Sequence, residues 1–262
     1  MYYATFPSPA HLAPYVRFFW VLEGKGPYIH RSMATTCPEM VFHYKGNFRD
    51  LMSDTKSLEI EFCGPSNRHQ RYETEEGFGI VGAFLYPFVL PELFGHPADA
   101  VSNEVIGMQD LAGKGGREWG ARILEANGNA ERVRLLAGFF EEKLAGVNVR
   151  ENGMDHFIRQ IVHRPMSFEV ELAAQQAGIS RRQFERRFRT RAGFGPKNFS
   201  RIARFQQSLQ QYDHPFSSLA DIAYACGYYD QSHFASEFKR FSGHRPRDYF
   251  LRHGEGTAWR NA

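Results

Sequence analysis

The sequence has little cysteine and no long apolar run, and both absences exclude certain kinds of protein. Cys37, Cys63 and Cys226 are widely spaced and form neither a disulfide framework nor a CxxC pair. Because no apolar stretch approaches the ~18 residues of a membrane-spanning helix, we expect no membrane segment. The N-terminus lacks a basic leader followed by an apolar segment, so we expect no secretion signal and a reduced, cytoplasmic protein.

The motifs of common enzyme classes are also missing. His30, His43, His69 and His96 are scattered and include no HxH pair, and the cysteines are too few for a zinc cluster. No GxSxG, P-loop or dinucleotide-binding GxGxxG pattern is present. We therefore expect no catalytic residues, no metal site, no cofactor and no enzymatic activity.

Positive charge is distributed unevenly along the chain. Residues 154–262 contain 17 Lys and Arg against 10 Asp and Glu, whereas residues 1–153 contain 15 against 19. A basic C-terminal part next to a mildly acidic N-terminal part indicates that only the C-terminal part contacts a polyanion.

The N-terminal 104 residues show the pattern of short β-strands. Aromatic and β-branched runs alternate with Gly, Pro and Asn, as in a sandwich or small barrel. Phe18, Trp20 and Leu22 are expected to share one face of a strand. The predicted strands are 17–23, 27–33, 39–44, 57–62, 70–74 and 78–86, followed by a short helix at 87–95.

The remaining sequence is typical of helices, so the predicted fold class is α+β. A helical pair at 115–146 would complete an N-terminal domain of residues 1–146, either packing on the strands or forming a dimer seam. The polar, Gly-containing segment 147–153 is the best linker candidate, and an all-α domain would occupy 154–262.

A repeat within this last domain is the most informative feature. Ala174 and Gly178 recur 49 residues later as Ala223 and Gly227. Phenylalanines 184 and 188, Gly193 and Pro196 recur 50 residues later as phenylalanines 234 and 238, Gly243 and Pro246. Each copy reads as two helices around a Gly turn, capped by Ser167 and Ser180 in the first copy and by Ser217 or Ser218 and Asp230 in the second. A long helix from Lys197 to about Tyr212 would join the two units.

The outer faces of the second helices suit contact with DNA. In the first unit this face is arginine-rich, and arginine can pair with guanine edges or clamp phosphates. In the second unit Gln231 and His233 are expected to read bases, and Lys239 to contact phosphates.

The stretch from Asp221 to Tyr249 closely resembles the signature of the AraC/XylS family of bacterial transcription regulators. The resemblance covers 154–252 and implies two helix-turn-helix units that place two helices in successive major grooves. The DNA-contact candidates, from the outer faces and from this resemblance together, are Arg181, Arg182, Gln183, Glu185 and Arg186 in the first unit, and Gln231, Ser232, His233, Ala235, Ser236 and Lys239 in the second.

Three positions depart from the family pattern. Ser236 and Phe250 stand where the family usually has arginine, and the loss of arginine at Ser236 predicts weaker binding by the second unit. Ala173 stands where a large aliphatic residue is usual, and Leu172 is expected to fill that space.

Residues 1–104 resemble, less specifically, the cupin-like N-terminal domains of many members of the family, which often hold a small effector. Aromatic and basic side chains on the predicted strands are the candidates for an effector pocket, although an aromatic core explains the aromatic ones equally well. These candidates are Trp20, Arg31, Phe42, Tyr44, Arg71 and Phe84.

The sequence thus predicts a sequence-specific DNA-binding transcription regulator, either activator or repressor, controlled by a small molecule in the N-terminal domain. Its expected partners are double-stranded DNA, a small-molecule effector and RNA polymerase, with a homodimer as a further expectation and no membrane. The alternative is a constitutive DNA-binding regulator whose N-terminal half serves only dimerisation or protein contacts.

Overall fold

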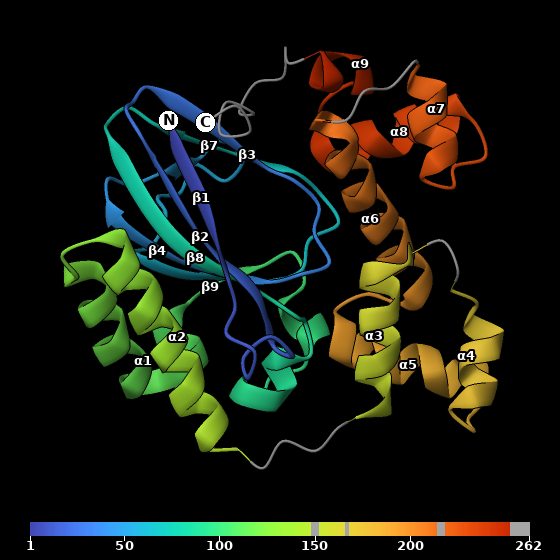
Figure 1. Ribbon diagram of the computed structural model, residues 1–262, viewed down its shortest axis with the longest axis horizontal. Helices are drawn as coiled ribbons and strands as arrows, with labels where there is room; N and C mark the ends of the chain where they lie inside the picture. The colour runs from blue at the N-terminus through green and yellow to red at the C-terminus, as the bar shows by residue number, and fades with distance from the viewer. Residues whose placement is uncertain (148–151, 166–167, 214–217, 252–262) are drawn as a thin grey trace.

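The computed structural model describes residues 1–147, 152–165, 168–213 and 218–251. It shows a β-rich N-terminal half followed by a helical C-terminal half, which confirms the predicted fold class (Figure 1). The proposed linker lies largely outside the described residues, as do the expected caps Ser167 and Ser217.

The N-terminal strands form two antiparallel sheets. The larger has the order β1-β2-β8-β4-β6-β9 and the smaller β3-β7-β5. Their bounds are β1 Tyr2–Pro7, β2 Val16–Gly24, β3 Tyr28–Ser32, β4 Glu39–Lys45, β5 Arg49–Asp50, β6 Ile60–Cys63, β7 Gln70–Thr74, β8 Phe78–Leu85 and β9 Val105–Gly107.

An apolar layer lies between the two sheets. Trp20, Leu22 and Ile80 from the larger sheet belong to it, and Tyr28 and Tyr72 from the smaller sheet pack against it. The alternate residues of the same strands point away from this layer, because neighbouring side chains of a strand face opposite sides. The large sheet therefore has two buried faces.

The outer face of the large sheet is covered by helices α1 (Met108–Glu125) and α2 (Asn129–Ala145) (Figure 1). This arrangement places the predicted helical pair within its own chain. Two short helices precede the pair, namely η1 (Leu90–Phe94), which ends at Gly95 with φ 71°, and η2 (Ala98–Val101).

None of the helices in the described ranges has the length and apolar character needed to cross a lipid bilayer.

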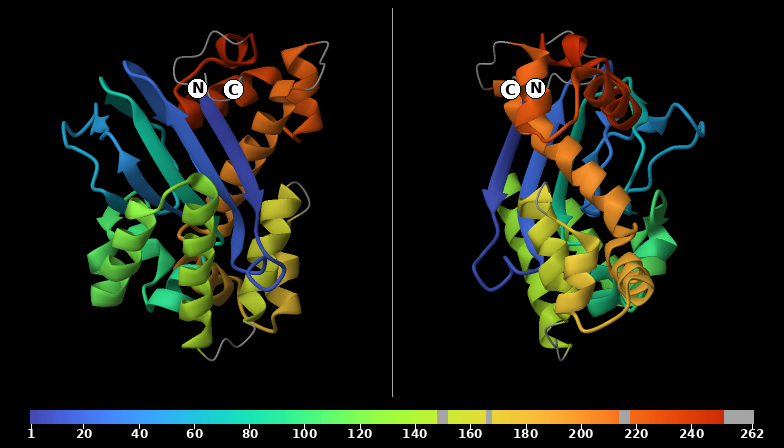
Figure 2. Two further views of the ribbon diagram at one scale, coloured as in Figure 1. Left: turned by 60° about the vertical axis from the view of Figure 1, so that its left-hand side comes forward. Right: turned by 90° about the vertical axis from the view of Figure 1, so that its right-hand side faces the viewer.

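The helical half is built around one long helix, α6 (Figure 2). Its elements are α3 Gly153–His163, α4 Val170–Gln176, α5 Arg181–Ala192, α6 Pro196–Leu209, η4 Gln210–Asp213, α7 Leu219–Ala225, α8 Gln231–Ser242 and α9 Pro246–Phe250. Helices α3–α5 lie at one end of α6 and α7–α9 at the other (Figure 1).

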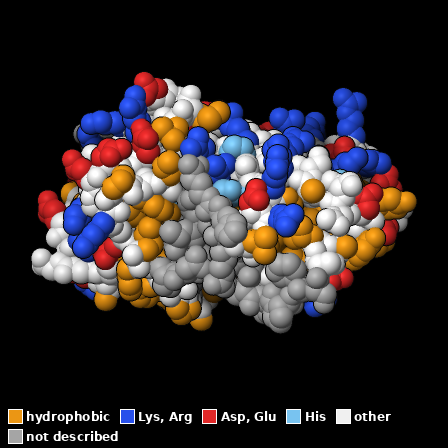
Figure 3. Space-filling view, turned by 90° about the horizontal axis from the view of Figure 1, so that it is seen from above, with side chains coloured by type: hydrophobic (Ala, Val, Ile, Leu, Met, Phe, Trp, Pro, Cys, Tyr) orange, Lys and Arg blue, Asp and Glu red, His pale blue; other side chains and the backbone are white. Residues whose placement is uncertain are grey.

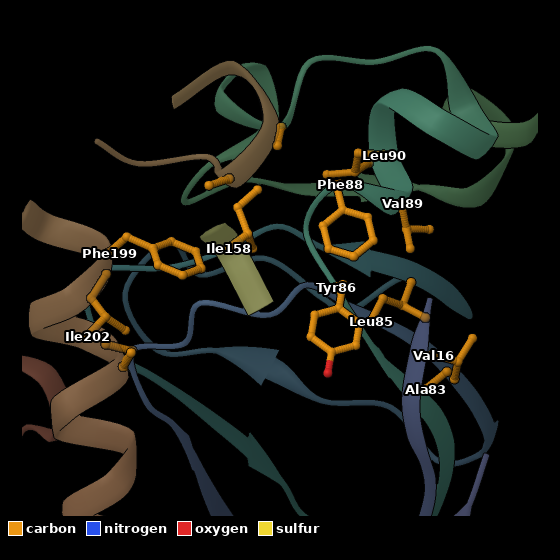
Figure 4. Close-up of a cluster of buried hydrophobic side chains, with 14 of the residues drawn as sticks. Val16, Ala83, Leu85, Tyr86, Phe88, Val89, Leu90, Ile158, Phe199 and Ile202 are labelled. Carbon is orange, nitrogen blue, oxygen red and sulfur yellow. The ribbon is translucent and has the colours of Figure 1, made fainter. Parts of the chain in front are cut away.

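One hydrophobic core runs across the boundary between the two halves. Tyr86 and Phe88, which follow β8, belong to the same buried cluster as Ile158 of α3 and Phe199 of α6 (Figure 4). Each of these four side chains is at most 6% exposed. The helical half is therefore held against the sheets by apolar packing as well as by polar contacts.

Candidate nucleic-acid interface

The first helix-turn-helix unit consists of α4 and α5. Gly178, with φ 64°, separates the two helices. The Ser180 hydroxyl accepts the Gln183 N–H at 3.3 Å and the Gln183 side chain accepts the Ser180 N–H at 3.1 Å, which closes a capping box at the start of α5. Phe184 and Phe188 are fully buried and stack on each other, so the opposite face of α5 points outward.

The second unit, α7 and α8, repeats this construction with different residues. The Ser218 hydroxyl accepts the Asp221 N–H at 3.2 Å and starts α7. Gly227, with φ 70°, makes the turn, and the Asp230 carboxylate accepts the His233 N–H at 2.7 Å to start α8. In both units the second helix therefore starts at a capped N-terminus.

Helix α6 sets the separation of the two units. Its 14 residues correspond to about 21 Å at 1.5 Å per residue, and η4 continues it to Asp213. Phe199, Ile202 and Phe205 along its inner side are fully buried. The helix is thus fixed by packing on both units.

Helices α5 and α8 both end against the sheet domain. The Ser102 hydroxyl donates to the Gly193 carbonyl at 2.9 Å, just beyond α5. Gly243, just beyond α8, lies so close to Arg31 and His69 that a Cβ at this position would collide with both side chains. Because both C-termini meet the sheet domain, the N-terminal halves of α5 and α8 extend away from it.

Most of the candidate DNA-contact residues of α5 are exposed, but some of their side chains already bond to other residues of the unit. Arg181 pairs with Glu171 and Glu185, each at 2.9 Å, and Gln183 serves the capping box. Arg182 and Arg186 are also exposed, and no described acidic side chain pairs with either guanidinium. Among the α5 candidates, these two arginines are therefore the most available for contact with a partner.

The α8 candidates form a less basic surface. Gln231, Ser232, His233, Ser236 and Lys239 are exposed and Ala235 is partly buried. The His233 imidazole lies 3.5 Å from the Glu237 carboxylate. Seen from the end that carries α7–α9, Lys and Arg side chains are spread over the surface rather than gathered into one field (Figure 3).

Sequence reasoning missed two aromatic side chains on the second unit. Tyr224 of α7 is 63% exposed and Tyr229, next to the cap of α8, is 87% exposed. Their exposure follows from the packing of α7 and α8, which the sequence pattern alone did not indicate. The expectation for Leu172 was wrong, because its side chain is 51% exposed and does not pack into the core beside the buried Ala173.

The effector candidates are divided between different environments. Trp20, Arg31 and Phe84 line a cavity of about 500 Å³ that lies between the sheets and α6. Phe42 and Tyr44 lie on the opposite face of the large sheet, Phe42 in the main core and Tyr44 bonded to Asn129 of α2 at 3.2 Å. Arg71 faces Arg31 across the β3–β7 ladder and does not line this cavity. Of the six candidates, the structure brings together only the first three.

The described residues contain no cluster of three or more His, Cys, Asp or Glu side chains that suits a metal ion.

Comparison with known proteins is consistent with this geometry. Residues 173–252 match the model of a helix-turn-helix domain family, and residues 4–107 match the model of a domain of unknown function. The transcriptional activator RhaS of Escherichia coli is 29% identical over 120 residues, which are 46% of this chain. The match covers only 36% of the length of RhaS.

Solved structures show the same fold. A crystal structure of an apo ToxT variant from Vibrio cholerae covers 89% of this chain and 97% of its own, with a TM-score of 0.50 and 14% identity. A second ToxT structure from Vibrio cholerae covers 96% and 98%, with a TM-score of 0.50 and 13% identity. At this identity the likeness concerns the arrangement of sheets and helices alone.

Proposed function

We propose that the helical half of this chain is the DNA-binding domain of an AraC-type helix-turn-helix transcription regulator, and that the protein binds a specific site on double-stranded DNA through α5 and α8. The N-terminal residues of a recognition helix contact base edges in the major groove, and two such helices require grooves about one helical turn apart.

The observation that carries this proposal is the repeated placement of α5 and α8. Each helix is capped at its outer end, buries a pair of phenylalanines on its inner face, and ends at a Gly turn against the sheet domain. The outer ends are therefore available to the same partner. Arg182 and Arg186 give the first unit the stronger share of the contacts.

We further propose that a small molecule bound beside the N-terminal sheets modulates DNA binding. The cavity between the sheets and α6 has about 500 Å³, within the usual range of ligand pockets. Hydrogen bonds cross the same boundary, because Gln206 of α6 accepts from the Thr36 hydroxyl at 2.8 Å and donates to that of Thr35 at 3.1 Å. A ligand that favours one arrangement of the halves would change DNA affinity by its differential binding. The cavity favours this regulated form over a constitutive DNA-binding protein.

The test uses a DNA site selected by the full chain from a random duplex library. Arg182→Ala and Arg186→Ala should each weaken binding to that site by about 1–3 kcal/mol, because each removes a contact to a base edge. Fluorescence anisotropy with the selected duplex and with single-base variants measures both affinity and preference.

Arg134→Ala is the matched control. Arg134 lies on α2, is 71% exposed and pairs with Glu131 of its own helix. The Arg134→Ala variant loses the same positive charge at a position far from α5, so it should bind the selected site like the unmodified protein. Unchanged affinity and unchanged base preference in both α5 variants would refute their assignment as readers.

A further inference from the structure

The cavity at the domain boundary continues toward the space between the sheets. A second, smaller cavity of about 100 Å³ lies there. The two cavities share wall residues from β2, β3, β4 and the segment between β3 and β4, namely Trp20, His30, Ser32, Thr35 and Glu39. The polar and aromatic groups at this junction therefore face both spaces.

Glu39 is the unusual member of this wall. It is the first residue of β4, and among the described residues no side chain bonds to or pairs with its carboxyl. Burial raises the pKa of this carboxyl to about 8. An ionised carboxylate in such surroundings is costly unless a cation or a set of donors satisfies it.

The positive groups near Glu39 do not supply that partner. The Arg17 guanidinium donates to the Cys37 sulfur at 3.3 Å, and Arg31 reaches the turn at Gly243. Burial, with a smaller contribution from His43, lowers the pKa of His30 to about 4, so the His30 imidazole is neutral. Within the described part of the chain, the wall thus offers one acidic group that no positive side chain neutralises.

The rest of the junction suits a flat apolar body. Phe18 and Phe84 stack with their ring centroids 4.8 Å apart, and Trp20 lies on the same strand face as Phe18. Aromatic faces attract cations as well as apolar rings. Two buried polar atoms, Nε1 of Trp20 and Nδ1 of His30, also have no hydrogen-bond partner in the described part of the chain. Buried polar atoms are normally bonded, so these two add polar character to a wall that is otherwise aromatic.

We propose that this cavity binds an organic cation with a flat aromatic body, whose ammonium group is held by Glu39 and whose ring lies against Trp20 and the Phe18–Phe84 pair. This inference rests on the proposed effector control and assigns the chemical class of the ligand. Gln206, Gln207 and Gln210 form the opposite wall, so the bound molecule contacts α6 and both halves of the protein at once.

Two indole compounds of similar size and opposite charge provide the test. Tryptamine and 3-indolepropionic acid are titrated into the full chain at about pH 8.5, above the raised pKa of Glu39, and binding is measured by calorimetry. Tryptamine should bind and 3-indolepropionic acid should not. Equal or tighter binding of the acid, or no binding of tryptamine, would overturn the proposal without the use of any variant.

Glu39→Gln keeps the shape of the side chain and removes its charge. It should weaken tryptamine binding at least about tenfold, because a charge-assisted bond is lost, and it should still bind the selected DNA in the absence of the amine. Glu59→Gln, at an exposed position outside the cavity, is the matched control and should bind tryptamine normally. Equal tryptamine affinity in the Glu39 and Glu59 variants would also overturn the proposal. DNA binding that persists while tryptamine fails to bind would refute the ligand class alone and leave DNA recognition standing.

Discussion

At the scale of the residue, Glu39 holds a position that costs stability. Its carboxyl has an ordinary pKa of 4.5, which burial raises to about 8 in the folded chain. A carboxyl whose pKa is raised by folding stabilises the folded state while it is protonated. This contribution is complete below the ordinary pKa and is lost as the pH rises through the raised one.

The pH dependence of stability should therefore change when Glu39 becomes permanently neutral. At about pH 8.5, Glu39→Gln should unfold with a free energy larger than that of the unmodified protein, by on the order of 2–4 kcal/mol. Near pH 4.5 the two proteins should agree. Urea unfolding at both pH values measures this difference, and a constant difference would show that burial of the carboxyl is not its source.

Single residues also show what a sequence pattern can and cannot predict. Strand alternation correctly grouped Phe18, Trp20 and Leu22 on one face. The strand predicted at 39–44 likewise places Phe42 and Tyr44 on one face, but the pattern did not indicate that α1 and α2 would cover that face. Which side of a sheet is covered depends on contacts between distant segments, and a period of two carries no information on that choice.

At the scale of the element, local chemistry determines the start and end of most helices. The caps Ser180 and Asp230 and the glycines 178, 193, 227 and 243 were all visible in the sequence, and they bound the helices as expected. Strands β1, β5 and β9 were not predicted, because β5 and β9 are only two and three residues long and β1 is a largely exposed edge strand. Their pairing partners, rather than their own composition, make them strands.

The capping box of α5 provides a prediction at this scale. Ser180→Ala removes the acceptor for the Gln183 N–H and should lower the free energy of unfolding by about 0.5–2 kcal/mol. Ser200→Ala, within α6, removes a hydroxyl at a position that needs no cap and should change stability little. Chemical denaturation of the two variants gives the comparison, and equal losses would exclude a capping role for Ser180.

At the scale of the whole molecule, the two halves are joined by a buried charge cluster. The Arg191 guanidinium of α5 donates to Asp155 of α3 at 2.7 and 2.9 Å and also to Glu92 of η1. Burial raises the pKa of Asp155 even though the hydrogen bonds from Arg191 oppose this shift. The C-terminal end of α5 is therefore bonded to the N-terminal half through Glu92.

Loss of the ion pair between Glu92 and Arg191 should weaken the contact between the two halves without unfolding either of them. In Glu92→Gln the charge attraction to Arg191 disappears, so amide hydrogen exchange should accelerate in η2 and in the last turn of α5. Exchange in α8 should stay unchanged. Glu118→Gln, at an exposed position of α1, is the control. Exchange that is equally fast in both variants would mean that the cluster does not hold the halves together.

The contacts at Gly193 and Gly243 bear on how a duplicated unit diverges. Each glycine ends a helix with a positive φ and leaves no space for a side chain against the N-terminal half. A side chain at either position would therefore disturb both the turn and the fit to the N-terminal half. The outward positions of α5 and α8 carry neither constraint, so the two copies are free to acquire different reading surfaces while their inner ends stay alike.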